Sequence, residues 1–525
     1  MIIHFRPIFL SFIFLAFGIF CFSRYMLGDS WLLILPCTLF ITYFLVFGLS
    51  KLLNEKFFLT VKKGLSYCVV GIFAFGAGVG LFALTQANYK LEFVPLPSAN
   101  YEVRGTVDGG VQHNDNANYF FLKDVVVVEE GKEIYIERNI RVYVYKSYET
   151  NIDLNDIMSG DKISVWGNIR STPVFKESGI NSYAYKNNFQ HTIYPDPISF
   201  ELTKSSGNVF DNVKNSVYNL YEENLDSPYS GFAYSVFSGD RSDLDKSVLR
   251  DFSTIGIAHI VAISGLHVGF LVVLLMWFMK KMRFNKWTKL IVITISLSLY
   301  TIFCGASPSV VRASIMAIFL LLGNLLGKQT DNLNSVSLAG IIILLFSPLY
   351  IFDLGFLLSF AGVFGIFFLY PVFKDAFSFL KFKWLIEGTA LTLAADIATI
   401  PIIANAFGYV SLISLIANLF LVPFFGFIFM AMFVLTIVVL ILPFLKFMFY
   451  IINIAILCLV KVAGFLAGLP FASFTFSGFG AGALISYYSG MFVSSRYVVV
   501  EYKYKLALIT ICYVAFCGFL VAMLI

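Results

Sequence analysis

Long runs of apolar residues are the feature that most restricts the fold of this chain. They occupy positions 8–22, 31–49 and 66–84, and they recur from 255 to the end of the sequence. A helix needs about 20 residues to cross a hydrocarbon core of roughly 30 Å, whereas barrel strands would be short alternating segments, which these regions lack. Only 13% of the 525 residues are charged, against about 25% in an ordinary soluble domain. The sequence therefore predicts a polytopic α-helical membrane protein.

Basic loops between the apolar runs set the expected orientation. No small-residue cleavage site follows the first run, so we expect a retained span rather than a signal peptide. Cytoplasmic loops carry excess Lys and Arg, which predicts cytoplasmic loops at 51–63, 280–289 and 374–383. We expect about thirteen or fourteen spans in all. Those after the first three are predicted at 255–277, 290–303, 310–326, 336–349, 354–373, 385–407, 412–430, 432–444, 448–466, 478–493 and 506–525.

The region 99–200 differs from the rest of the chain. Its segments YEVRGTVDG, YFFLKDVVVVEEG, RNIRVYVYK and DKISVWGNIR are rich in Val, Ile and Tyr and bounded by Gly, Asp and Asn, which predicts strands. A sandwich or a small Greek-key barrel such as an OB-fold would fit this pattern. Ten basic and fourteen acidic residues give the region a charge of −4. Tyr119, Phe120, Tyr143 and Trp166 either contribute to a local nucleic-acid-binding face or pack the barrel.

These patterns divide the chain into four units. Residues 1–98 are expected to form a membrane anchor of three spans, and 99–200 an OB-fold-like domain outside the membrane. Residues 201–237 form a linker in which 211–224 has the spacing of an amphipathic helix on the membrane surface. Residues 238–525 form a multi-helix membrane domain. The fold class is thus a polytopic helical membrane protein with an inserted all-β domain.

A polar stretch at 238–270 opens the last unit and carries His259, Ser264 and His267. Ser264 and His267 are three residues apart, which places them on one helical face. They could form a Ser/His hydrolase pair with Asp240, Asp243 or Asp245 orienting the histidine, although AISGL is not the GxSxG elbow. Alternatively, Ser264 and Gly265 break the helix and the histidines line a polar path, or these residues simply pack.

Other ionisable residues inside the predicted spans are also candidates, because such groups are costly in lipid and usually face a cavity. Asp353 is expected to cap a helix start, and Lys461 to extend to the interface. Arg312 follows Pro308 and is expected near the outer interface. Asp396 lies nearer to a span centre and is the stronger functional candidate.

Several kinds of chemistry have no sequence support. The seven cysteines lie in or beside apolar runs without CxxC spacing, and the remaining histidines are scattered, so we expect no metal site. No GxxxxGK[ST] loop occurs, so we expect no NTPase. The chain is expected to be neither an enzyme nor a holder of a cofactor.

The stretch GDRSDLDKSVLRDFSTIGIAHIVAISGLHVGF resembles the signature of the ComEC-type competence proteins. SPSVVRASIMAIFLLLGNLLGK, ADIATIP and SLISLIANLFLVPFFG follow the family pattern in order, and SGINSYAYKNNFQHTIYP resembles the segment that closes the family's OB-fold domain. The matching signature positions are Gly239, Asp240, Arg241, His259, Ser264, Gly265, Leu266 and His267. Asp396 stands where the family pattern leads us to expect a neutral amide. The resemblance leads us to expect a member that lacks the C-terminal metallo-β-lactamase-like domain carried by many members.

The resemblance implies a channel that passes single-stranded DNA across the cytoplasmic membrane during natural transformation. Its implied partners are membrane lipid, a DNA receptor, a separate nuclease, a cytoplasmic motor and, as a further candidate, a second copy of the chain. A phosphate backbone needs a hydrated, locally positive route. The expected path residues are Asp240, Arg241, Arg250, His259, Ser264, Gly265, His267, Arg312 and Asp396. A transporter for another substrate and an intramembrane hydrolase remain the alternatives.

Overall fold

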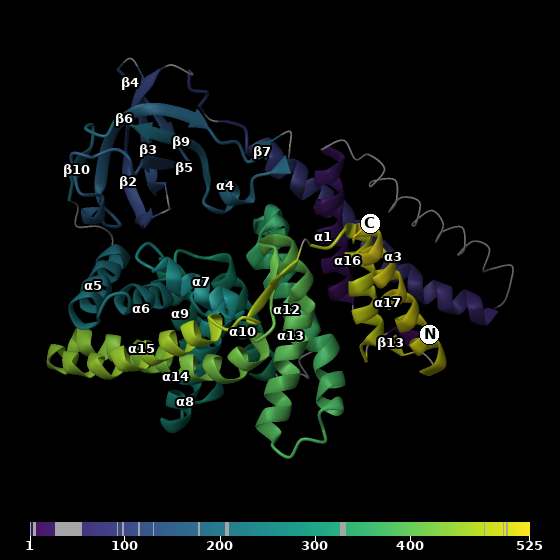
Figure 1. Cartoon of the computed structure of the whole chain (residues 1–525). Helices are drawn as coiled ribbons and strands as arrows, with labels where there is room; N and C mark the ends of the chain where they lie inside the picture. Colours follow the sequence, from purple (N-terminus) through teal and green to yellow (C-terminus); the bar gives the residue numbers. More distant parts are fainter. Residues whose placement is uncertain are drawn as a thin grey trace.

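The computed structural model places an inserted β barrel against a bundle of helices (Figure 1). It describes residues 2–3, 7–26, 55–91, 93–96, 99–113, 116–129, 131–176, 179–204, 209–325, 332–476, 478–496, 498–499 and 502–524. The barrel follows the helices α1 (Pro7–Met26) and α3 (Glu55–Asn88), and the chain then continues through α5 (Val209–Asn224) into the rest of the bundle. All four segments that were predicted as strands are strands.

Five strands close the barrel: β2 (Asn100–His113), β3 (Ala117–Glu129), β5 (Asn139–Tyr145), β9 (Phe189–Pro195) and β6 (Lys162–Ser171). Each pairs with the next in that order, and β6 pairs back to β2, so the sheet has no free edge along this path. All pairings are antiparallel except that of β5 with β9. A closed ring of strands removes the sandwich alternative. The short strands β4 (Lys132–Ile136) and β10 (Glu201–Thr203) extend β3 and β6.

Alternation along each strand fills the barrel with branched apolar residues. On β2 and β5, Val103, Val107, Ile140 and Val142 are fully buried, while their sequence neighbours face outward. Phe120 is also fully buried, so it packs the barrel. Gly167 is required where β6 meets β9, because a Cβ there would lie 2.3 Å from the carbonyl oxygen of Tyr194.

Within the described residues, seven helices are long and apolar enough to cross a membrane. They are α1, the Val69–Asn88 part of α3, α9 (Lys286–Phe303), α12 (Leu354–Ala376), α13 (Lys383–Phe407), α14 (Ser414–Ile441) and the segment Pro443–Ala467 that contains α15 (Phe449–Ala467). The helices α10 (Pro308–Leu325) and α11 (Asn332–Phe346) contain shorter apolar stretches. Near the C-terminus, α16 (Ala481–Ser494) and α17 (Tyr502–Leu524) pack together. In Figure 1, α15 runs across the direction of α12 and α13.

Four predicted boundaries need correction or fall outside the description. Residues 55–63, predicted as a loop, are helical because α3 starts at Glu55. The two spans predicted at 412–430 and 432–444 are one 28-residue helix, α14, since nothing at their junction breaks a helix. The single span predicted at 255–277 is interrupted, with its regular helix beginning at Gly265. The span predicted at 31–49 lies outside the described residues.

The barrel rests on the helices through an apolar contact that we call the apolar seat. It combines barrel residues with residues from α3, α12 and the 3-10 helix η3 (Pro348–Phe352): Phe82, Phe121, Tyr185, Phe189, Leu349 and Phe356. Tyr185 meets Tyr350 edge to face, with ring centroids 5.7 Å apart. The same cluster includes α1, whose Phe12 stacks on Phe360 of α12 at 5.1 Å. The seat therefore joins the beginning, the barrel and the middle of the chain.

Candidate functional site

The polar stretch 238–270 forms a chain of short elements between the barrel and the bundle. Helix α6 (Tyr229–Ser238) ends at Gly239, whose φ of +87° suits glycine. Helix α7 (Lys246–Thr254) begins after Asp245, whose side chain accepts from the N–H of Ser247 at 2.6 Å. A 3-10 turn, η2 (Ala258–Ile260), then leads to α8 (Gly265–Lys281). Residues 255–264 are therefore an interruption of helical structure inside an otherwise helical domain.

Ser264 and His267 form a capping box at the start of α8. The N–H of Ser264 donates to Nδ1 of His267 at 3.2 Å, and the N–H of Leu266 donates to Oγ of Ser264 at 3.3 Å. The ring of His267 is fully buried between Phe425 and Phe429 of α14, with centroids 5.4 and 5.0 Å away. Among the described residues, no carboxylate bonds to its other nitrogen, as a triad would require. Oγ of Ser264 also lies 3.4 Å from Nδ1 of His267. This geometry fits helix capping, and the hydrolase alternative stays a prediction.

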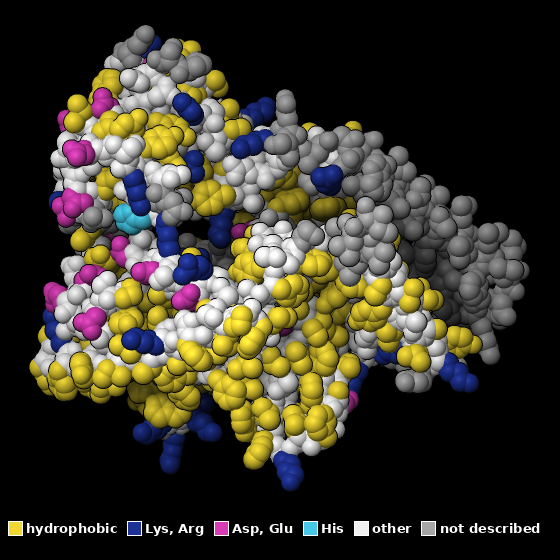
Figure 2. All heavy atoms as spheres, viewed as in Figure 1, with side chains coloured by type: hydrophobic (Ala, Val, Ile, Leu, Met, Phe, Trp, Pro, Cys, Tyr) yellow, Lys and Arg dark blue, Asp and Glu magenta, His cyan; other side chains and the backbone are white. Residues whose placement is uncertain are grey.

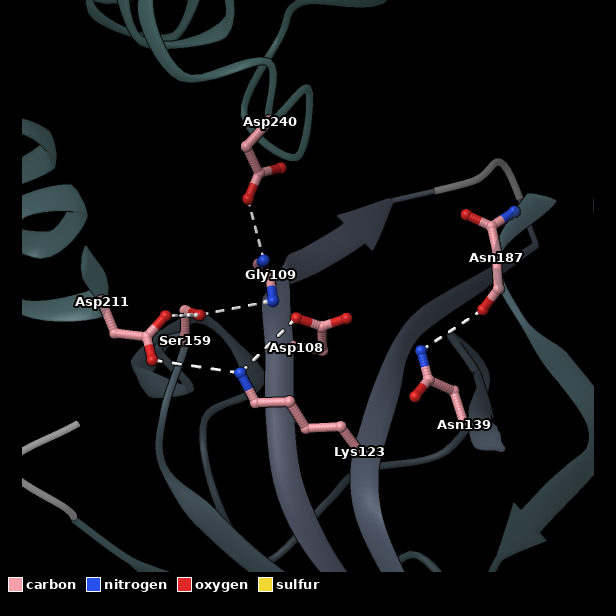
Figure 3. Close-up of polar contacts among 9 residues, drawn as sticks. Asp108, Gly109, Lys123, Asn139, Ser159, Asn187, Asp211 and Asp240 are labelled. Carbon is pink, nitrogen blue, oxygen red and sulfur yellow. Dashed lines mark hydrogen bonds and ion pairs between the residues drawn. The ribbon is translucent and has the colours of Figure 1, made fainter. Parts of the chain in front are cut away.

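The loop after α6 is bonded directly to the barrel by Asp240. Its Oδ2 accepts from the N–H of Gly110 at 2.8 Å (Figure 3). Its Oδ1 accepts from the N–H of Ser242 at 3.0 Å. Gly110 lies in a bulge of β2 where the register with β3 shifts. A bulge leaves a strand N–H without a ladder partner, so it is available to the carboxylate. Two residues 130 positions apart are thus brought together.

Asp211 of α5 extends this contact, as Figure 3 shows. Oγ of Ser159 donates to its Oδ1 at 2.7 Å, and Nζ of Lys123 lies 4.0 Å from its Oδ2. Asp211 is 6% exposed, so these bonds are largely shielded from water. The first turn of α5 bonds to the barrel through Asp211, and the expected position of this helix on the membrane surface stays a prediction. We call this set the polar junction: Gly110, Lys123, Ser159, Asp211 and Asp240.

A second group of candidates meets where α7, α13 and α14 approach one another. Oδ2 of Asp396 accepts from Oγ of Ser414 at 2.8 Å. A Cβ on Gly256 would lie 2.7 Å from Cβ of Ser414, so the turn after α7 packs directly on this pair. The side chain of His259, three residues after Gly256, is exposed. Within the described residues Asp396 has a hydroxyl as its partner and no cation within ion-pair distance.

The three candidate arginines do not come together. Arg312 lies at the end of α10 that approaches α12, where its Nη2 donates to the carbonyl oxygen of Gly355 at 2.7 Å. It is 1% exposed, so its side chain is buried, and its expected position near the outer interface stays a prediction. Arg250 is exposed and lies 3.8 Å from Asp251, and Arg241 is exposed on the loop before α7. Whether any of them contacts phosphate stays a prediction.

Two remaining expectations concern helix ends. Asp353 caps α12 as predicted, because its Oδ1 accepts from the N–H of Phe356 at 2.9 Å. It also lies 3.5 Å from Lys186 of the barrel, a pairing that the sequence did not indicate. Gly265 is exposed and Lys461 lies exposed on α15.

The sequence did not indicate the roles of Gly110, Ser159 and Asp211. The Gly-Gly pair within a predicted strand was the one available signal of a bulge.

A bundle of apolar helices that carries an inserted closed barrel defines a multi-pass membrane protein with a β domain. A model described as competence protein matches residues 236–499, which is half of the chain, and the chain belongs to this family. The resemblance inferred from its motifs is thereby confirmed. Over 198 residues the chain is 32% identical to ComE operon protein 3 of Bacillus subtilis (strain 168). That match covers 38% of this chain and only 25% of the relative's length. No solved structure matches the chain.

Proposed function

We propose that this protein takes part in DNA uptake during natural transformation, by passing one strand of DNA across the cell membrane. The observation that carries the proposal is the position of the family region, which starts at 236 and therefore includes the loop bonded to the barrel. The same region contains the helix interruption at 255–264. Interrupted helices at membrane depth are tolerated where they line a hydrated cavity, which is what a translocation path needs.

The topology of the barrel supports a nucleic-acid role. Its strand order, β2-β3-β5-β9-β6 closing on β2 with a parallel β5–β9 pair, fits an OB-type barrel. Such barrels bind single strands through surface aromatics and cations. The barrel contacts the family region at both the polar junction and the apolar seat. A DNA strand bound to the barrel would therefore lie next to the helical bundle.

Charge distribution supports an external position for the barrel. Figure 2 shows Lys and Arg side chains at the end of the helices farthest from the barrel, where α8 passes to α9 and α12 to α13. The positive-inside rule makes that end cytoplasmic, and the barrel would then face the outside. The same view shows a hollow between the barrel and the helices, with basic side chains at its rim. We propose that DNA enters there, delivered by a receptor and supplied as a single strand by a separate nuclease.

His259, Asp396 and Ser414 are the proposed polar lining next to the helix interruption. The path needs few charges, because a phosphate backbone is repelled by carboxylates and held too tightly by dense cations. A single Asp396 bonded to a hydroxyl is compatible with this requirement. Asp240 and Arg241 would mark the entrance, while Ser264, Gly265 and His267 would hold the start of α8.

The test is uptake of labelled DNA and transformation in cells with and without the gene. We expect loss of both without the protein, and restoration by the unchanged chain. Substitution Ser264→Asn distinguishes the alternatives, because Asn caps a helix about as well as Ser but is no nucleophile. A channel should keep most of its transport with this variant, whereas a Ser/His hydrolase should lose all turnover. Normal transformation without the protein would contradict the proposal, and would leave a transporter for another substrate.

A further inference from the structure

A row of tyrosines covers the outer face of the barrel over three neighbouring strands. Tyr119 of β3 stacks on Tyr143 of β5 with ring centroids 6.4 Å apart, and Tyr145 stacks on Tyr194 of β9 at 6.1 Å. Tyr143 also meets Tyr194 at 5.7 Å. Tyr148, in the loop after β5, continues the row at 6.1 Å from Tyr145 and is 56% exposed. We call these five residues the tyrosine row.

The tyrosine row carries two arginines that have no acidic partner. The guanidinium of Arg141 lies 5.4 Å from the centre of the Tyr143 ring, and that of Arg170 lies 4.9 Å from the centre of the Tyr194 ring. Within the described part of the barrel, neither lies within ion-pair distance of a carboxylate. This is notable in a region with fourteen acidic and ten basic residues. Arg141 also lies 5.1 Å from the centre of the Phe189 ring, and its buried Nε has no hydrogen-bond partner. A guanidinium packed against rings can still donate N–H groups to an anion.

A cavity of about 370 Å³ opens beside the exposed end of the row. Its lining includes Tyr145 and Tyr148 together with His113, Asn118 and Lys146. Nδ1 of His113 lies 2.8 Å from Oδ1 of Asn118, so polar groups are fixed at its wall. Flat rings, unpaired cations and a polar recess are the groups that recognise a base and its phosphate.

We propose that the tyrosine row binds single-stranded nucleic acid, with bases on the rings and phosphates on Arg141 and Arg170. This deepens the proposed function and rests on it for the identity of the substrate. A duplex cannot use the row in this way, because its base faces are already covered by neighbouring base pairs. A membrane-interface role is the less favoured explanation, because such belts combine Tyr or Trp with apolar neighbours. Apart from Phe121 at the Tyr119 end of the row, its neighbours include Asn118, His113, Arg141 and Arg170, which are polar or charged.

The experiment measures binding of labelled oligonucleotides to the full chain in detergent micelles, by fluorescence anisotropy. A 20-nucleotide oligothymidine should bind more tightly than a 20-base-pair duplex. Replacing Tyr143 and Tyr145 by Ala should weaken single-strand binding on the order of ten-fold or more, because each stacked base contributes substantially. Replacing both by Phe keeps the rings and should keep binding. Tyr135→Ala is the matched control, since Tyr135 is 75% exposed on β4 and outside the row.

Salt dependence tests the arginines separately. The double variant R141Q/R170Q should lower the slope of log Kd against log salt by about 1.4, since each single-strand phosphate contact contributes roughly 0.7. Tighter duplex binding, equal weakening by Tyr135→Ala, or equal loss with Phe and Ala variants would overturn the proposal. The proposal would also be wrong if polyphosphate competed as effectively as oligothymidine. It would be wrong as well if the row bound anionic lipid vesicles and the chain bound no oligonucleotide.

The two proposals fail in different ways. If cells without the protein transform normally while the purified chain still binds oligothymidine through the row, the proposed function is wrong and this inference stands. If transformation needs the protein but the Ala variants bind as the unchanged chain does, this inference is wrong and the proposed function stands.

Discussion

The barrel is attached to the helices in two places that differ in chemistry. At the apolar seat, aromatic and branched residues such as Phe189 and Leu349 are fully buried. At the polar junction, a few directional bonds connect Asp240 to Gly110 and Asp211 to Ser159. Burying one large apolar side chain contributes about 1.5–3 kcal/mol, whereas one hydrogen bond contributes a net 0.5–1.5 kcal/mol or so. The seat therefore fixes where the barrel sits, and the junction can open at a smaller cost.

The largest effect is expected from a cavity in the seat. Leu349→Ala should destabilise the attachment by about 3 kcal/mol, because a fully buried leucine loses its contacts and leaves a void. Hydrogen exchange of the amides in α4 (Ser182–Lys186) and β9 should rise accordingly. Leu345→Ala is the matched control, since Leu345 is 49% exposed on α11. Equal effects of the two variants would show that the seat does not hold the barrel.

A smaller effect is expected from breaking the junction at the backbone. In Gly110→Ala the new Cβ would lie 2.9 Å from both Oδ2 of Asp240 and Oγ of Ser242, so the loop must move and the hydrogen bond is lost. We expect a cost of about 1–2 kcal/mol, seen as faster exchange at 109–111 and in the loop 240–245. Exchange in α4 should not change. Asp240→Asn keeps an acceptor oxygen and should have a weaker effect than Gly110→Ala. If Gly110→Ala also speeds exchange in α4, the apolar seat and the polar junction behave as one unit.

The smallest effect concerns pH at the junction. Enclosure by protein raises the pKa of Asp243 above its usual 3.8, as do the charges of Asp240 and Glu222, while His113 and a bond from Tyr218 lower it. Ionisation of Asp243 thus opposes the closed loop. The stabilisation that protonated Asp243 gives to the closed loop is complete below about pH 4. It is lost as the pH rises through the raised pKa of Asp243.

Asp243→Asn should abolish this dependence and slow exchange in the loop 240–245 at neutral pH. Asp245→Asn provides the contrast, because bonds from Ser247 lower the pKa of Asp245 and its ionised form stabilises α7. That variant should slightly speed exchange at neutral pH. An unchanged pH profile in Asp243→Asn would contradict the assignment.

Local patterns predicted much of the fold. The strands of the barrel follow from Val, Ile and Tyr alternation between turn residues, and the capping by Asp353 follows from its place before an apolar run. The break at Ser264 and Gly265 was one of the alternatives that the sequence left open, and α8 does begin at Gly265. Its capping box was not predicted, because it uses His267 where the usual pattern has Glu or Gln.

Contacts between distant residues could not be predicted. The carboxylate of Asp240 could have faced solvent, lipid headgroups or DNA, and its actual partner is an amide 130 positions earlier. Arg312 was expected near the outer interface because it follows Pro308, and that pattern does not indicate its burial. Its burial depends on the carbonyl of Gly355, which only the packing of α10 on α12 brings close. The roles of residues that depend on such packing cannot be predicted from the local sequence.

The stacking of Phe12 on Phe360 has a consequence for biosynthesis. At about 5 to 20 residues per second, the roughly 350 residues between the two rings take about 20 to 70 s to make. During that interval α1 and α3 are paired with each other but lack their permanent neighbour, and the barrel has no seat. A quality-control protease or an insertase that recognises unassembled apolar faces would meet this protein in that form, and truncated chains that end before α12 should be degraded.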